Sequence, residues 1–95
     1  MKEISLRQYG PAITNINVAQ TIYQQIAECN PGECEVTIDF DGVEAMTTQC
    51  AKAIFGKLYK ELGADVFYAN LIYKSCSEGL KIVIELGIES VLNLG

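Results

Sequence analysis

Carboxylate and hydroxyl side chains lie close together between Asp39 and Thr48, and their types suggest more than one kind of chemistry. Asp39 and Asp41 are near enough in sequence to share a proton or to hold Mg²⁺. An Asp-Gly pair, however, is also what tight turns prefer. The chain contains no histidine that would complete a general-base set. We therefore expect no catalytic residue, no metal site and no cofactor, and we expect that the chain is not an enzyme.

Thr47 and Thr48 stand directly before a stretch of apolar residues at helical spacing. Threonine is a common N-cap because its hydroxyl accepts a hydrogen bond from an unpaired N–H group of the first helical turn. The pair therefore predicts the start of a helix, and capping alone is enough to explain it. The residues that follow on the apolar stripe are Ala51, Ile54, Phe55, Leu58 and Leu62.

Four cysteines could suggest disulfides or a metal site. Cys29 and Cys34 flank an Asn-Pro-Gly turn at a spacing that zinc knuckles do not use, and no histidine is present to complete a ligand set. A zinc site would need a fold that gathers all four thiols. We interpret the cysteines as reduced thiols that behave as small apolar side chains.

Strand and helix patterns alternate along the whole chain. Period-two alternation predicts strands over residues 2–6, 34–40 and 71–74, with Ile4 and Leu6 pointing inward in the first. Helical spacing predicts helices from about Asn17 to the turn at residues 30–32, from residues 47–48 to Gly63, and from Ser75 or Ser77 onward. Either Asn15 or Asn17 could cap the first helix. This order favours the α/β class, as a small sandwich with a mostly parallel or mixed sheet packed with about three α-helices.

Charge and hydropathy exclude some classes of function. The net charge is −5, and no Lys or Arg occurs between Gln8 and Ala51, although six acidic residues do. A phosphate backbone would require a basic stripe, so we expect no nucleic-acid binding. The apolar runs are too short to cross a bilayer and the first residues lack the apolar region of a signal peptide. We expect a single domain over residues 1–95 in the cytoplasm, without membrane contact.

The segment from Val36 to Thr48 is similar to that of a known family. It resembles STAS domains, the fold of bacterial anti-sigma-factor antagonists, in which an apolar strand leads through Asp-Leu-Ser-Gly-Val to Asp-Ser-Ser-Gly at a helix start. A closer resemblance is to short bacterial STAS-like proteins of unknown function. The motifs that carry it are Asp39-Phe40-x-Gly42-Val43, Phe55-Gly56-Lys57-Leu58 and Ser77-Glu78. The resemblance implies a STAS-like α/β fold.

The resemblance also implies a role in binding a regulatory protein. In the antagonists a partner kinase phosphorylates the first Ser of Asp-Ser-Ser-Gly, and here Thr47-Thr48-Gln49-Cys50 stands at those positions. Thr48 is therefore the phospho-acceptor candidate, and the implied partner is an anti-sigma-factor-type kinase or a related ATPase. A phosphate there would meet free N–H groups and the positive end of the helix dipole. The partner-binding surface that we expect comprises Asp41, Gly42, Glu44, Thr47, Thr48, Gln49, Lys52 and Gly56.

Three alternatives remain open from the sequence. The same helix start could bind a small ligand, either a nucleotide or another anion. Ile82 and Leu86 fall off the apolar stripe of the last helix and could form a homodimer contact. Gly56, in the middle of a helix, indicates that another backbone approaches closely, from within the fold or from a partner. With Lys52, Lys57 and Lys60 around it, this helix would present a basic face beside the acidic loop.

Overall fold

A three-stranded parallel sheet forms the base of the structure, a computed structural model that describes residues 2–93. Its strands are β1 (Lys2–Ser5), β3 (Val36–Asp39) and β5 (Leu71–Lys74), in the order β1-β3-β5. Ile4, Ile38 and Tyr73 are neighbours in the register and share the inner face. The predicted strands and the inward direction of Ile4 and Leu6 are confirmed, since both side chains are buried.

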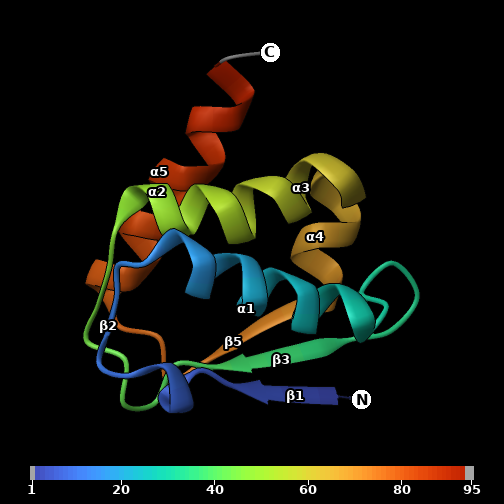
Figure 1. The fold of residues 1–95 in the computed structure, drawn as a ribbon. Helices are drawn as coiled ribbons and strands as arrows, with labels where there is room; N and C mark the ends of the chain where they lie inside the picture. Colours follow the sequence, from blue (N-terminus) through green and yellow to red (C-terminus); the bar gives the residue numbers. More distant parts are fainter. Residues whose placement is uncertain (1, 94–95) are drawn as a thin grey trace.

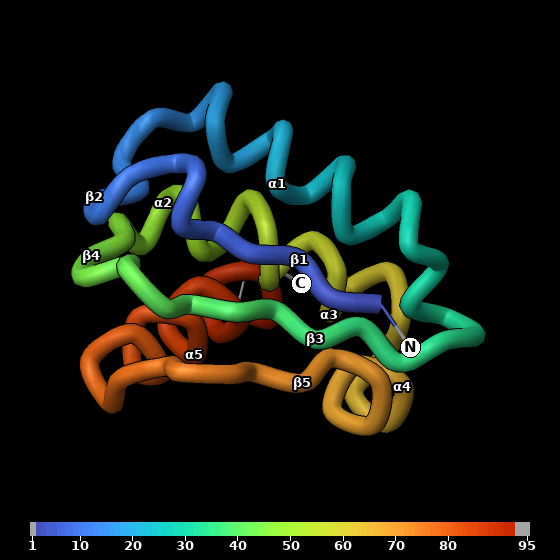
Figure 2. Tube along the Cα trace, turned by 90° about the horizontal axis from the view of Figure 1, so that it is seen from below, coloured from blue at the N-terminus to red at the C-terminus, as the bar shows by residue number. Residues whose placement is uncertain are grey.

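All the long helices cover one face of this sheet, as Figures 1 and 2 show from two directions. α1 (Ile16–Glu28) lies toward β1, and α5 (Glu78–Asn93) lies toward β5. Between them runs one long helix, made of α2 (Thr48–Ala51), the π-helical segment η2 (Lys52–Gly56) and α3 (Lys57–Leu62). The opposite face of the sheet carries mostly polar side chains. The α/β class with parallel strands is therefore confirmed.

The helix boundaries decide between the alternatives that the sequence left open. Asn15 caps α1, because its side-chain oxygen accepts from the N–H of Asn17 at 2.8 Å. Ser77 rather than Ser75 caps α5, since its hydroxyl accepts from the N–H of Leu80 at 3.2 Å. Gly63 ends α3 with a φ of 85°, a conformation that glycine adopts at little cost.

Four short elements were not predicted. The 3₁₀ helix η1 (Arg7–Tyr9) follows β1, and α4 (Ala64–Asn70) fills the connection between α3 and β5. The strands β2 (Ala12–Ile13) and β4 (Ala45–Met46) pair in parallel, apart from the main sheet. Each strand has only two residues, which is too short for alternation to reveal. No strand was predicted over residues 12–13 or 45–46.

Two glycines allow α5 to cross the long helix at very short range. A Cβ atom on Gly56 would lie 2.9 Å from the carbonyl oxygen of Gly87 and 3.0 Å from a methyl group of Val91. A Cβ atom on Gly87 would lie 2.7 Å from the backbone nitrogen of Lys52. Gly56 is therefore buried against the fold itself, and its place in the expected partner surface is corrected. The close approach that it indicated comes from within the domain.

Three aromatic rings fill the space where this crossing meets the sheet. The ring centroids of Phe40 and Phe55 are 6.0 Å apart, and Tyr73 stands edge-on to both at 5.7 and 5.8 Å. The hydroxyl of Tyr73 is buried, and among the described residues it has no hydrogen-bond partner. Burial raises the pKa of the Tyr73 phenol, so the hydroxyl stays neutral at physiological pH.

Tyr73→Phe is expected to raise the free energy of unfolding by about 1 kcal/mol. A buried hydroxyl without a partner costs desolvation energy, and no hydrogen bond compensates for this cost. Tyr9→Phe is the matched control, since the Tyr9 hydroxyl donates to Gln25 Oε1 at 2.6 Å. This control should lower stability by a similar amount. Urea unfolding of both variants measures the difference. Destabilisation by Tyr73→Phe would show that the hydroxyl is satisfied in solution.

Candidate functional site

The loop before the long helix is exposed, yet its backbone is fixed. The side chains of Val43 and Met46 are buried and anchor it to the core. The carbonyl oxygen of Pro11 accepts from the N–H groups of Glu44 and Ala45, at 2.7 and 3.1 Å. The N–H of Thr47 donates to the carbonyl of Ile13 at 3.1 Å, which continues the pairing of β2 with β4. The exposed side chains between these anchors are therefore presented from a rigid backbone.

A tight turn precedes this loop and uses the carboxylates that suggested catalysis. Asp39 Oδ1 accepts from the N–H of Asp41 at 2.9 Å, and the N–H of Val43 donates to the carbonyl of Phe40 at 2.9 Å. Gly42 has a φ of +87°, which favours glycine. The side chain of Arg7 lies beside Gly42, and a Cβ atom added to Gly42 would lie 3.1 Å from the Cγ atom of Arg7. The carboxylate of Asp39 thus stabilises the turn.

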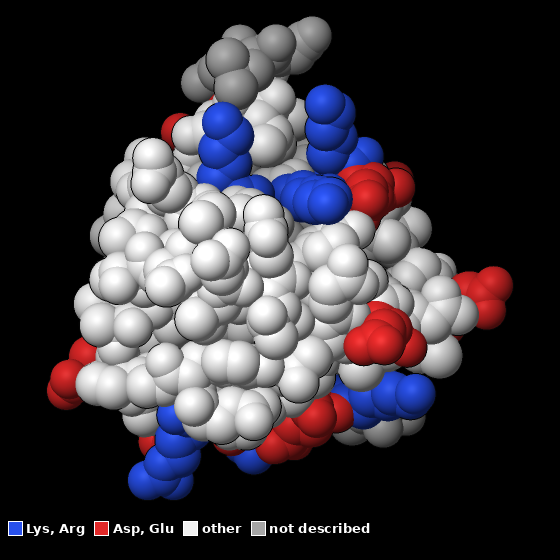
Figure 3. All heavy atoms as spheres, viewed as in Figure 1, with Lys and Arg blue, Asp and Glu red and all other residues white. Residues whose placement is uncertain are grey.

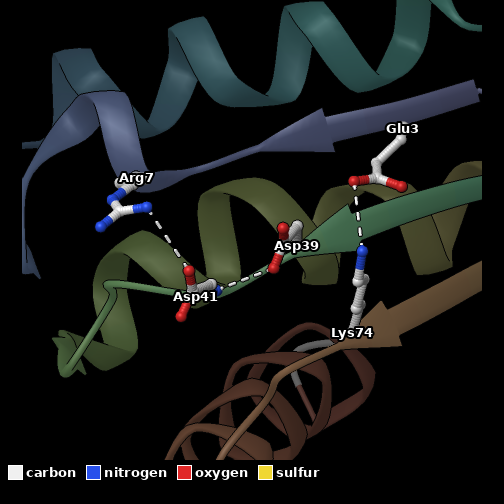
Figure 4. A network of polar contacts seen from close by, with 5 residues as sticks. All are labelled: Glu3, Arg7, Asp39, Asp41 and Lys74. Carbon is white, nitrogen blue, oxygen red and sulfur yellow. Dashed lines mark hydrogen bonds and ion pairs between the residues drawn. The ribbon is translucent and has the colours of Figure 1, made fainter.

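Two exposed ion pairs surround the turn (Figure 4). Arg7 lies 3.6 Å from Asp41, and Lys74 of β5 lies 3.7 Å from Glu3 of β1. Both pairs are more than half exposed, so solvent screens them and each contributes little to stability. Within residues 2–93 no group of three or more acidic or cysteine side chains is placed to hold a metal ion. Glu44 is exposed beside this turn and adds to its negative charge.

The structure gives Thr47 and Thr48 different roles. Thr47 is the N-cap, because its hydroxyl accepts from the N–H of Cys50 at 3.2 Å and its backbone is extended. Thr48 is the first helical residue, and its exposed hydroxyl makes no hydrogen bond within the described part of the chain. Capping therefore explains Thr47 and leaves Thr48 without a structural task. The sequence alone did not separate the two.

The expected surface residues are mostly brought together. Those between residues 41 and 49 are exposed on either side of the buried Val43 and Met46, whereas Gly56 is buried. Lys52 is half-buried one turn further along the helix. The exposed members are Asp41, Gly42, Glu44, Thr47, Thr48 and Gln49.

Two residues that border this surface were missed by the sequence reasoning. Ile16 at the start of α1 and Val91 near the end of α5 line a groove beside Gln49 and Lys52. Ile16 is 46% exposed, which is high for a large apolar side chain. No sequence pattern could have indicated a role for Ile16, because the residues around it come from three separate helices and depend on how these helices pack.

The cysteines and the last helix agree with simple structural roles. All four cysteines are free, with Cys50 buried in the core and Cys34 exposed in its turn. Ile82 and Leu86 on α5 are 59% and 46% exposed, and they remain available as a contact between copies. No helix among residues 2–93 has the length and the apolar composition that a membrane span requires.

Comparisons with known proteins give one match. Neither the curated proteins nor the solved structures contain a significant match to the chain. A family model matches residues 18–81, about two thirds of the chain, and its description is a STAS-like domain of unknown function (DUF4325). The matched region includes the motifs over residues 39–43 and 55–58 as well as Ser77-Glu78, and the mixed α/β structure with parallel strands is consistent with that description. The chain belongs to this family of STAS-like domains.

Proposed function

We propose that this chain is a non-enzymatic regulatory module that binds a protein partner through the 41–48 loop and the start of the long helix. Phosphorylation of Thr48 is the switch that we propose for this contact. The observation that carries the proposal is the exposed hydroxyl of Thr48 on a rigid helix start, with the capping task already met by Thr47. A kinase can reach a hydroxyl in this position. Its phosphorylation would leave the fold intact, because the helix cap is formed by Thr47.

The rigidity of the loop supports protein binding. Binding costs less when the contacting backbone is already ordered, because little conformational freedom is lost. The hydrogen bonds to Pro11 and Ile13 provide this order, while the side chains of Glu44, Thr48 and Gln49 remain exposed. Functional residues commonly lie on loops that a rigid scaffold holds in this way.

The charge of the loop supports the proposed direction of the switch. A phosphate on Thr48 would add a charge of about −1.5 to −2. Asp41 and Glu44 are already exposed in the preceding loop, so the modified surface would be strongly negative. The free N–H groups at the helix start would hold the phosphate in place. An acidic partner would be repelled, and any close contact at Thr48 would also be blocked by bulk.

The partner class that we propose is an anti-sigma-factor-type kinase or a related ATPase. This choice is supported by the similarity of the Val36–Thr48 segment to the phosphorylated segment of anti-sigma-factor antagonists. In this chain Thr48 keeps a hydroxyl at the acceptor position, although Thr47, Gln49 and Cys50 differ from the antagonist motif. The helix start itself is retained.

Thr48→Glu is expected to weaken partner binding at least about tenfold, which corresponds to 1.4 kcal/mol. The change should not unfold the chain, because an acidic residue is favourable in the first turn of a helix. Thr21→Glu is the matched control: Thr21 is an exposed threonine of α1 and gains the same charge. Affinity is measured with the partner that the wild-type chain captures from its native cell extract.

Thr48→Ala provides the second control for the switch. It should keep partner binding, because Thr47 still caps the helix, and it should abolish incorporation of phosphate by the partner kinase. Equal binding by Thr48→Glu and the wild-type chain would refute the proposed contact surface. A partner that binds but never transfers phosphate to Thr48 would refute the switch alone. Capture of a nucleotide at the helix start in place of a protein would favour the small-ligand alternative.

A further inference from the structure

A groove with an apolar floor and a basic rim lies beside the proposed partner surface. It has a volume of about 610 Å³. Its floor is formed by Ile16 of α1, Ala53 of the long helix and Val91 of α5, and its rim by Lys52, Lys57 and Lys60. Figure 3 shows basic side chains gathered above the uncharged face of the molecule. Gln49 lies at one end of the groove, directly after Thr48.

The π-helical segment η2 brings the lysines to one side of the helix. The N–H of Lys57 donates to the carbonyl of Lys52, five residues back. In a regular α-helix residues five apart point in clearly different directions. A turn closed over five residues is wider and places them nearly above one another. Lys60 follows Lys57 by three residues, which also lie on one side. The rim is therefore a consequence of this unusual backbone.

The basic rim is unusual for this chain as a whole. The net charge is −5, yet three of the seven basic residues lie at this groove. The two ion pairs found within residues 2–93 involve Arg7 and Lys74, and neither involves a rim lysine. The ammonium of Lys57 lies 4.3 Å from the centroid of the Tyr23 ring. The acidic group next to this lysine, Glu61, accepts the hydrogen bond of the Tyr23 hydroxyl.

We infer that the groove binds an acidic amphipathic helix of the protein partner. Apolar side chains of that helix would cover Ile16, Ala53 and Val91, and its carboxylates would meet Lys52, Lys57 and Lys60. Recognition of an amphipathic helix by an apolar groove is a common mode of protein binding, and complementary charge at the rim selects the partner. The inference rests on the proposed function, because the groove and Thr48 would be covered by one and the same partner.

A second copy of the chain is a less favourable occupant. The exposed face of α5 combines Ile82 and Leu86 with Glu85 and Glu89, so it is itself acidic and amphipathic. A contact between this face and the groove would join two different surfaces. Such contacts do not close between two copies and instead build larger rings or open chains. The symmetry of the contact, and not its charge, therefore favours a different protein as the occupant.

The probe for this inference is a synthetic helical peptide with leucine on one face and glutamate elsewhere. A second peptide carries lysine in place of every glutamate. The wild-type chain should bind the glutamate peptide and not the lysine peptide, with an affinity that falls as salt is added. Fluorescence anisotropy of the labelled peptides measures both. Equal binding of the two peptides, or binding of neither, would overturn the inference.

Two double variants, each of which replaces two lysines by glutamate and so changes the net charge equally, test where the peptide binds. K52E combined with K60E should weaken binding of the glutamate peptide at least about tenfold. K2E combined with K81E reverses two exposed lysines outside the groove and should change affinity by less than about threefold. Ile16→Ala removes apolar floor without changing charge and should weaken binding severalfold. Circular dichroism first establishes that each variant is folded. Equal losses in the two double variants would overturn the inference.

The natural partner separates this inference from the proposed function. A partner that Thr48→Glu loses, but that the K52E and K60E variant binds at full affinity, would overturn the groove and leave the proposed function standing. A partner that does not bind the K52E and K60E variant, but binds Thr48→Glu as tightly as the wild-type chain, would support the inference about the groove. The same result would refute the function proposed for Thr48. Assembly of the chain alone, abolished by Leu86→Lys as well as by K52E and K60E, would make a second copy the occupant and overturn the inference.

Discussion

Replacing Gly87 by alanine is expected to lower the free energy of unfolding by at least about 2 kcal/mol, although alanine normally stabilises a helix. The added Cβ would lie 2.7 Å from the backbone nitrogen of Lys52 and 2.8 Å from the backbone carbon of Ala51. Backbone atoms within a helix cannot turn aside as the end of a flexible side chain can. The two helices must therefore separate, and packing is lost along the crossing.

Gly79 offers a matched control on the same helix. A Cβ atom there would meet nothing within 4 Å, so Gly79→Ala should raise stability by up to about 1 kcal/mol through the lower entropy of the unfolded chain. Urea unfolding measures both variants under the same conditions. The expected result is a change of sign between two Gly→Ala substitutions in α5. An increase in stability for Gly87→Ala would show that the helices cross at longer range than the structure gives.

Phe55→Ala is expected to have the largest effect on stability, a loss of about 3–5 kcal/mol. Phe55 is fully buried and its ring packs against Phe40 and Tyr73. Its removal leaves a cavity between the long helix and the sheet, and rigid strands and a close helix crossing limit how far the site can collapse. A domain of this length has a total stability of roughly 5–15 kcal/mol. The variant should therefore be partly unfolded at physiological temperature.

Phe55→Leu distinguishes loss of volume from loss of shape. Leucine retains most of the buried apolar surface, so the cost should stay below about 2 kcal/mol. Calorimetry or urea unfolding of the two variants measures the difference. If the Phe55→Ala and Phe55→Leu proteins unfold at the same urea concentration, the core around Phe55 can rearrange to fill the cavity. Phe55 would then lie at the edge of the core and not at its centre.

The main elements of this fold could be predicted from sequence because each has a strong local signal. Val36, Ile38 and Phe40 alternate with Thr37 and Asp39 along β3 and its end, and all three apolar side chains are buried. The stripe from Ala51 to Leu62 has helical spacing and ends at Gly63, which has a positive φ. These patterns depend only on the period of side-chain direction, which is a property of local backbone geometry.

Other features depend on contacts between distant segments, and no local pattern reveals them. The pairing of β2 with β4 joins residues more than thirty positions apart through two-residue strands. The π-helical turn from Lys52 to Gly56 forms where α5 crosses the long helix at Gly87. Gly56 shows the limit most clearly. Its place within a helix indicated a close approach, but the sequence did not say whether the fold or a partner would make it.

The candidate site was predictable in position and only partly in detail. The composition of residues 39–48 indicated a turn and a helix start, and the structure places both there. Which of Thr47 and Thr48 caps the helix was not predictable, because both are threonine and suit the N-cap equally. Only the hydrogen bond from the N–H of Cys50 assigns the cap to Thr47 and leaves Thr48 exposed.

The most direct test of the proposed binding surface is nuclear magnetic resonance of the isotope-labelled chain, titrated with the partner captured from its native cells. The expected result is that amide signals of residues 41–49 shift or broaden first, with those of the groove at Lys52, and that phosphorylated Thr48 abolishes these changes. Signals that move only on the open face of the sheet around Ile72, or only around Ile82 and Leu86 on α5, would contradict the assignment of the partner surface to the 41–48 loop.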